Sequence, residues 1–110
     1  MANLNVTGNI TINNTRIAES SSNSNGYCIR LFDGTRKIQL CSNALNNEGT
    51  ATFPRPFSSV PNVICGIINS SSASQISYRT MSAYDISTTG FNFQLTGSTA
   101  KTYIAIGEWL

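Results

Sequence analysis

The acidic residues are the first candidates for chemistry, because a pair of carboxylates can perform general acid and base catalysis. The chain has five of them, and each stands alone in the sequence: Glu19, Asp33, Glu48, Asp85 and Glu108. A serine nucleophile would lack an activating base, since the chain has no histidine. A cleft around an acid pair is also hard to build in 110 residues. We therefore expect that the protein is not an enzyme.

Aromatic and charged side chains gather in one stretch of the second half of the chain. Tyr78 and Arg79 stand together, and Tyr84 and Asp85 follow shortly after them. Aromatic rings stack on the C–H faces of sugars, and Arg and Asp side chains bind hydroxyl groups. The alternative is structural, with half-buried strand tyrosines and a surface pair of Arg79 with Asp85. We take all four as candidate ligand-binding residues.

Trp109, close to the end of the sequence, is a fifth candidate ligand-binding residue. Its ring offers a platform on which a ligand can stack. It also follows the apolar Ile104 and Ile106, and this pattern favours packing at a subunit interface over ligand binding.

The cysteines predict neither a metal site nor a cofactor. Cys28, Cys41 and Cys65 are odd in number, lack CxxC spacing and have no histidine to join them. Cys28 and Cys41 flank one predicted hairpin, so a bridge between them is conceivable. We favour buried free thiols, as in a protein that folds in a reducing cytoplasm.

The composition argues against nucleic acid as a partner. Charged residues make up 11% of the chain, against roughly 25% in an average soluble protein. The basic residues are scattered apart from the pair Arg36-Lys37, which predicts a solvated surface rather than a basic stripe. The sequence also has no apolar run long enough to span a membrane and no signal-peptide pattern at its start.

The first 26 residues divide into two segments. From Leu4 to Ile12, apolar residues and Gly8 occupy even positions and Thr or Asn the odd ones, which is the pattern of a strand with one apolar face. A ribbon this short cannot bury its own apolar face, and another copy of the chain could cover it. Residues 1–19 are therefore predicted to form an oligomeric β-stalk. The polar run at residues 20–26 is predicted to be a linker.

Residues 27–110 have the pattern of an antiparallel β-sandwich. Asp33-Gly34 between two alternating runs predicts a hairpin over residues 27–41 with a type I′ turn. Pro54 and Pro56 predict an edge or a bend. The β-branched run at 63–68 predicts a strand buried on both sides, and further strands are expected at 90–95 and 103–110.

From about Thr50 onward the sequence resembles the C-terminal head domains of bacteriophage tail fibres, which are similar to H-type lectins. The resemblance rests on four motifs in order: Thr52-Phe53-Pro54 with Pro56-Phe57, Val60-Pro61-Asn62-Val63, Ile86-Ser87-Thr88-Thr89-Gly90-Phe91, and Tyr103-Ile104-Ala105-Ile106-Gly107. Two earlier stretches look similar to the opening hairpin of such heads and to fibre-shaft repeats: Gly26-Tyr27 with Asp33-Gly34-Thr35, and Val6-Thr7-Gly8-Asn9-Ile10.

The resemblance implies an all-β head of six strands that forms a homotrimer on a fibre shaft. It further implies a protein of the virion, made in the host cytoplasm, that binds a bacterial surface polysaccharide or outer-membrane protein to recognise the host. In lectin relatives the sugar site lies near subunit boundaries and often includes a histidine, which this chain lacks. The rival hypothesis is a purely structural fibre or trimerisation module without a ligand.

Overall fold

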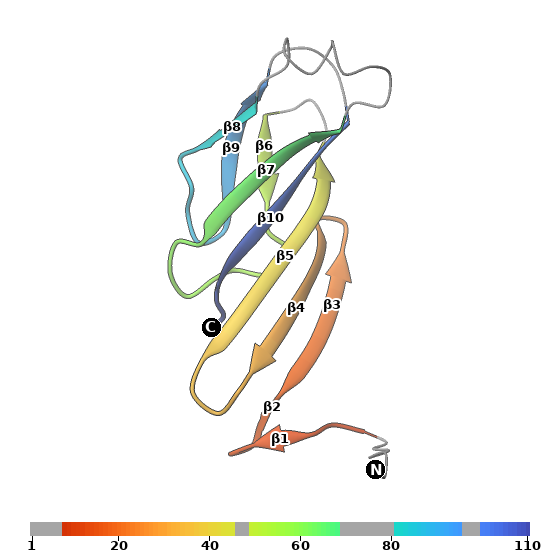
Figure 1. The fold of residues 1–110 in the computed structure, drawn as a ribbon, viewed down its shortest axis with the longest axis vertical. Helices are drawn as coiled ribbons and strands as arrows, with labels where there is room; N and C mark the ends of the chain where they lie inside the picture. Colours follow the sequence, from red (N-terminus) through yellow and green to blue (C-terminus); the bar gives the residue numbers. More distant parts are fainter. Residues whose placement is uncertain (1–7, 46–48, 69–80, 96–99) are drawn as a thin grey trace.

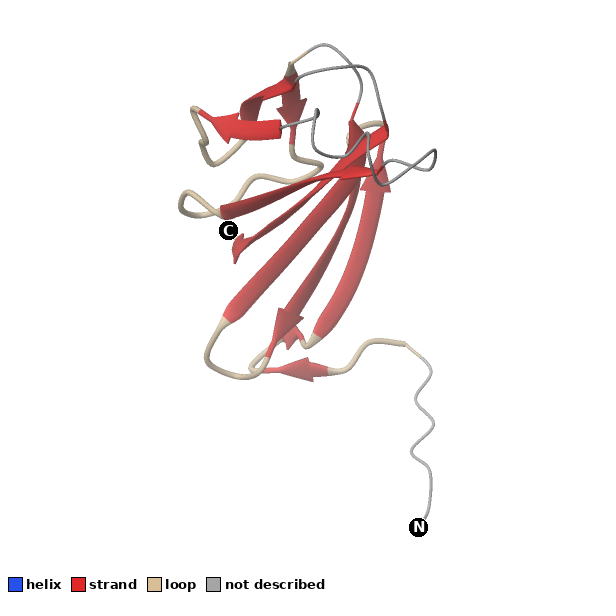
Figure 2. Cartoon of the chain, turned by 45° about the horizontal axis from the view of Figure 1, so that its top comes forward, coloured by secondary structure: helices blue, strands red, loops and turns tan. Residues whose placement is uncertain are grey.

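The computed structural model describes residues 8–45, 49–68, 81–95 and 100–110, and every regular element in these ranges is a β-strand (Figures 1 and 2). Within these ranges the chain forms ten strands in this order: β1 (Thr11–Ile12), β2 (Thr15–Arg16), β3 (Ala18–Asn23), β4 (Gly26–Phe32), β5 (Lys37–Leu45), β6 (Thr50–Thr52), β7 (Asn62–Ile68), β8 (Met81–Tyr84), β9 (Gly90–Leu95) and β10 (Ala100–Glu108).

Two antiparallel sheets form the body of the fold. The larger sheet has the order β3-β4-β5-β10-β7, and the smaller one has the order β6-β9-β8. The smaller sheet covers one face of the larger sheet at one end of the molecule (Figures 1 and 2). This arrangement confirms the predicted all-β antiparallel sandwich.

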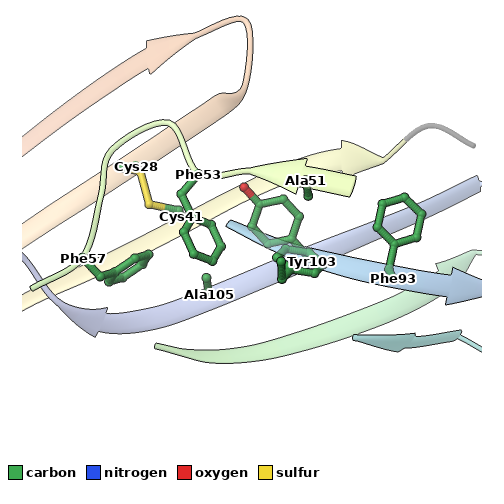
Figure 3. Close-up of a cluster of buried hydrophobic side chains, with 9 residues drawn as sticks. Cys28, Cys41, Ala51, Phe53, Phe57, Phe93, Tyr103 and Ala105 are labelled. Carbon is green, nitrogen blue, oxygen red and sulfur yellow. A yellow bond between two sulfur atoms is a disulfide. The ribbon is translucent and has the colours of Figure 1, made fainter. Parts of the chain in front are cut away.

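Aromatic side chains fill the space between the two sheets (Figure 3). Phe53 and Phe57 meet edge to face with their ring centroids 5.0 Å apart, and Phe91 meets Tyr103 at the same distance. A fully buried ring of this kind stabilises the fold by about 1.5–3 kcal/mol. The core consists of Cys28, Cys41, Ala51, Phe53, Phe57, Phe91, Phe93, Tyr103 and Ala105.

A disulfide lies at one side of this core. Cys28 and Cys41 face each other across β4 and β5, with their Cα atoms 4.1 Å apart, and they form a bond to each other. The favoured prediction of free thiols is therefore wrong for this pair. The strand register decides the outcome, because it places both side chains on the inner face of the sheet. Cys65 is free.

The predicted hairpin over residues 27–41 is confirmed by β4 and β5, but its turn differs from the prediction. The strands are joined by residues 33–36, in which Gly34 has a φ of 97°. The Asp33 carboxylate accepts the N–H groups of Thr35 and Arg36, and these hydrogen bonds lower its pKa. A type I′ turn joins β1 to β2 instead, where Asn13 and Asn14 both have positive φ.

The polar run at residues 20–26 is part of the larger sheet rather than a linker. Residues 18–23 form β3, which pairs with β4 along its whole length. Serine and asparagine satisfy this edge position because their side chains face water on a strand with little to bury. Of the predicted stalk, β1 and β2 are described, while residues 1–7 lie outside the described ranges.

The strand predicted at residues 63–68 is present as β7, but it is not buried on both sides. It forms an edge of the larger sheet, and Ile64 is 62% exposed. A continuous β-branched run is thus compatible with an edge strand whose outer face is apolar. The bend predicted at Pro54 and Pro56 is confirmed, and Phe57 at its end pairs with Trp109.

Candidate functional site

Two hollows lie on either side of β6 and share Thr50, Ala51 and Thr52. Ala51 is buried in the core, whereas Thr50 and Thr52 are exposed, as expected for a strand with one inner face. We call them the β5–β6 hollow and the β6–β9 hollow. Among the described residues that line them, Asp85 alone carries a charge. Both linings are therefore rich in neutral hydrogen-bonding groups.

The β6–β9 hollow has a volume of about 230 Å³. The hydroxyl group of Ser87 shapes its rim by accepting hydrogen bonds from the N–H groups of Thr89 and Gly90. A side chain at Gly90 would collide with the backbone oxygen of Ala51, so glycine allows β9 to approach β6 closely. The lining residues are Thr50, Ala51, Thr52, Asp85, Ser87, Thr89, Gly90, Phe91 and Asn92.

The β5–β6 hollow has a volume of about 250 Å³. This lies just below the range of roughly 300–1,000 Å³ usual for small-molecule pockets. Hydroxyl and amide groups dominate the lining, which consists of Ser24, Asn25, Asn43, Ala44, Leu45, Thr50, Ala51, Thr52 and Tyr103.

Tyr103 is the aromatic residue in the lining of the β5–β6 hollow. The residue is 1% exposed, and its ring crosses the interior from β10 toward β6 (Figure 3). Its hydroxyl has no hydrogen-bond partner among the described residues. Burial raises the pKa of Tyr103 to about 12, so the hydroxyl keeps its proton and remains a donor. Leaving such a donor unsatisfied costs about 1–3 kcal/mol.

The predicted ligand-binding residues are only partly brought together. Tyr84 ends β8 and is 49% exposed, and Asp85 follows it with a φ of 49° and lines the β6–β9 hollow. Tyr78 and Arg79 lie outside the described residues. Of the expected group of four, the structure therefore places Asp85 at a hollow and Tyr84 outside both linings.

Trp109 lies apart from both hollows, whose linings do not include it. It shares the inner face of the larger sheet with Tyr103 and Ala105, and its ring contacts Arg30 and Lys37. The indole N–H donates to the backbone oxygen of Leu31 at 3.4 Å. The apolar Ile104 and Ile106 point to the opposite face of the sheet, so Trp109 does not share a face with them. Packing of Trp109 at a subunit interface stays a prediction.

Sequence reasoning missed Tyr103, Asn43 and the two threonines of β6. Tyr103 belongs to an alternating run that predicts a strand, and nothing in that run marks it as a site residue; the structure buries it in the core. Nothing local in the sequence indicates that this residue also lines a polar hollow. The alternation Thr50-Ala51-Thr52 does predict two hydroxyl groups on the outer side of the strand, and this pattern could have indicated the β6 residues of the site.

The outer face of the larger sheet is a second notable surface. Ile29, Leu40 and Ile106 lie side by side across β4, β5 and β10, and Ile104 lies beside Ile64 of β7. Soluble monomers rarely expose so continuous an apolar patch. We define the outer face as Tyr27, Ile29, Leu31, Ile38, Leu40, Ile64, Ile104 and Ile106.

The described part of the chain offers little for other kinds of chemistry. Its residues include no cluster of three or more His, Cys, Asp or Glu that could hold a metal ion. They also include no helix with the length and hydropathy to cross a membrane.

Comparison with known proteins identifies one similarity. A family model described as the H-type lectin domain matches residues 48–110, which is more than half of the chain. Searches of the curated proteins and of the solved structures find no match. The matched range holds the whole lining of the β6–β9 hollow and, in the β5–β6 hollow, Tyr103 together with the β6 residues.

Proposed function

Because the chain belongs to the H-type lectin domain family, we propose that it is the tip of a phage tail fibre and binds a glycan on the bacterial surface. Membership of this family supports carbohydrate binding. The resemblance of this chain's motifs to those of phage tail-fibre heads supports a role in a virion. In this proposal the hollows beside β6 hold the sugar. The observation that carries it is a hollow lined by neutral polar groups and by Tyr103, whose buried hydroxyl has no partner among the described residues.

The chemistry of both linings suits a sugar. A sugar presents many hydroxyl groups that donate and accept hydrogen bonds, and threonine hydroxyls and asparagine amides can do both in return. Thr50, Thr52 and Asn43 supply such groups around the Tyr103 donor. Each site is small, so a single copy would bind weakly. Binding to a cell surface then requires several copies on one particle.

We further propose that the chain acts as a homotrimer whose subunits cover one another at the outer face. The exposed isoleucines of β4, β7 and β10 are the support for this, because burial of their side chains stabilises association. Three sites on one tip raise the avidity for a repeating polysaccharide well above the affinity of one site.

Replacing Tyr103 with phenylalanine should weaken sugar binding by about tenfold, because one buried hydrogen bond to the ligand is lost. The melting temperature should stay the same or rise, because the hydroxyl has no partner among the described residues of the protein. Calorimetric titration with an oligosaccharide that the wild type binds measures the affinity, and thermal unfolding measures the melting temperature.

The matched control is Tyr84→Phe, which removes the same atom from an exposed tyrosine outside both linings. Its affinity should equal that of the wild type. Equal affinities for all three proteins would show that the ligand does not reach the Tyr103 hydroxyl.

The proposed function itself is tested with the fluorescently labelled chain and a panel of bacterial strains. We expect saturable labelling of some strains, and its loss after periodate oxidation of the surface glycans. Loss after protease treatment alone would identify an outer-membrane protein as the receptor instead. A stable trimer that labels none of the strains would favour the rival, purely structural role, for which the outer face alone is sufficient.

A further inference from the structure

Four cations that are far apart in the sequence meet near one end of the larger sheet. The Glu19 carboxylate of β3 lies 3.6 Å from Arg16, 3.6 Å from Arg30 and 3.0 Å from Arg55. Arg30 and Lys37 both lie over the ring of Trp109, at 5.0 and 4.7 Å from its centroid. We call Arg16, Arg30, Lys37 and Arg55, with Glu19 and Trp109, the cationic cluster. These four basic residues are scattered in the sequence but lie together in the structure, and Arg16 and Lys37 are solvated as expected.

The cluster concentrates the positive charge of the whole protein. Its four cations and one carboxylate sum to +3, whereas the formal charge of the chain is +2, so all other residues together sum to −1. Because only 11% of the residues are charged, the net charge of +3 on the cluster produces a positive electrostatic potential in this region. A single carboxylate also cannot saturate three guanidinium groups, each of which has several N–H donors.

A buried glutamine fixes the position of the cluster by hydrogen bonds. Gln39 is 0% exposed, and its side-chain oxygen accepts the Nε–H of Arg30 at 2.8 Å. Its amide nitrogen donates to the backbone oxygens of Arg55 and Pro56. Arg30 and the bend that carries Arg55 are thus fixed before any ligand arrives, which lowers the entropy cost of binding.

These contacts fasten the bend that carries Arg55 to β3, but fastening the bend does not require four cations. One pair, Arg55 with Glu19, is enough to fasten the bend to β3, and Gln39 holds it as well. The additional cations repel one another: burial first, and then the charge of Arg55, lower the pKa of Arg30, although Glu19 opposes them. An added anion would relieve this repulsion and form charge-assisted hydrogen bonds with the guanidinium groups.

We propose that the cationic cluster binds an anionic group, a carboxylate or a phosphate, of an acidic surface polysaccharide. The inference rests on the proposed function and names the class of glycan. The neutral hollows beside β6 would contact the hydroxyl groups of the polymer, while the cluster selects chains that carry negative charge. Arg16 and Lys37 are the exposed members that a ligand reaches first.

The test compares Lys37→Gln with Arg36→Gln. The two residues are neighbours in sequence and lose the same charge, but Arg36 pairs with Asp33 in the turn and does not belong to the cluster. Binding of three polymers is measured: oligogalacturonate for carboxylates, polyglycerol phosphate for phosphates and dextran as the uncharged reference. We expect Lys37→Gln to weaken binding of a charged polymer by about twofold to fivefold, and Arg36→Gln to have a smaller effect.

The charged polymer whose binding Lys37→Gln weakens identifies the anionic group as a carboxylate or a phosphate. Equal effects of both variants would mean that only the overall charge matters, and this would overturn the proposal. Failure of the wild-type protein to bind either charged polymer would also overturn it. Binding of neutral glycans in that case would leave the proposed carbohydrate-binding function intact, so the two failures are distinguishable.

Discussion

Replacing Cys28 and Cys41 together with serine should lower the free energy of unfolding by about 3 kcal/mol. The bond joins residues 13 apart in sequence and so restricts the unfolded chain across the β4–β5 hairpin. Both sulfur atoms also lie in the core, where Cys28 is 1% and Cys41 0% exposed, so two hydroxyl groups would replace packed apolar atoms. We expect the melting temperature to fall by about 10–20 °C.

The matched control for this experiment is Cys65→Ser, which changes the free cysteine of β7. This residue is only partly buried, and its replacement should cost less than about 1 kcal/mol. Scanning calorimetry at one fixed protein concentration compares the variants, because self-association would otherwise shift the transition. A double variant that melts at the wild-type temperature would contradict the structural importance of the bond.

Replacing Ile104 with lysine should convert the proposed trimer into a monomer. Ile104 is 40% exposed and lies at the centre of the outer face, next to Ile64 in the register of β10 and β7. In a subunit interface the new ammonium group would be buried without a partner, which costs several kcal/mol. Light scattering after gel filtration should give the mass of three chains for the wild type and of one for the variant.

Val60→Lys is the control for this variant. Val60 is 61% exposed but lies in the connection before β7 rather than on the sheet, so the same charge should leave the trimer intact. A wild-type protein with the mass of one chain would contradict the proposal that the outer face is an interface. A trimeric Ile104→Lys variant would contradict the location of that interface.

The fold could be predicted from the sequence because its signals are local. Period-two alternation, the Asp-Gly turn and the paired prolines each act within a few residues, and the hairpin of β4 and β5 and the bend after β6 are where these signals place them. The serine-rich β3 was missed because an edge strand needs no apolar pattern when its partner strand supplies the hydrogen bonds.

The candidate site depends on contacts between distant residues, and the sequence alone does not contain these. Tyr103 reaches a hollow whose other walls come from the β3–β4 turn, β5 and β6. Arg55 approaches Glu19 from 36 residues away. Likewise, the facing positions of Cys28 and Cys41 are set by the strand register. Side chains of these types are common in the sequence, and only the pairing of strands shows which of them meet.

The central claim, carbohydrate binding, is tested most directly with an array of oligosaccharides from bacterial surfaces probed by the intact wild-type protein. We predict that the protein retains at least one of them, and that Tyr103→Phe retains the same oligosaccharide more weakly while Tyr84→Phe matches the wild type. A folded wild-type protein that retains no oligosaccharide, even with multivalent display at about 1 mM sugar, would contradict the account.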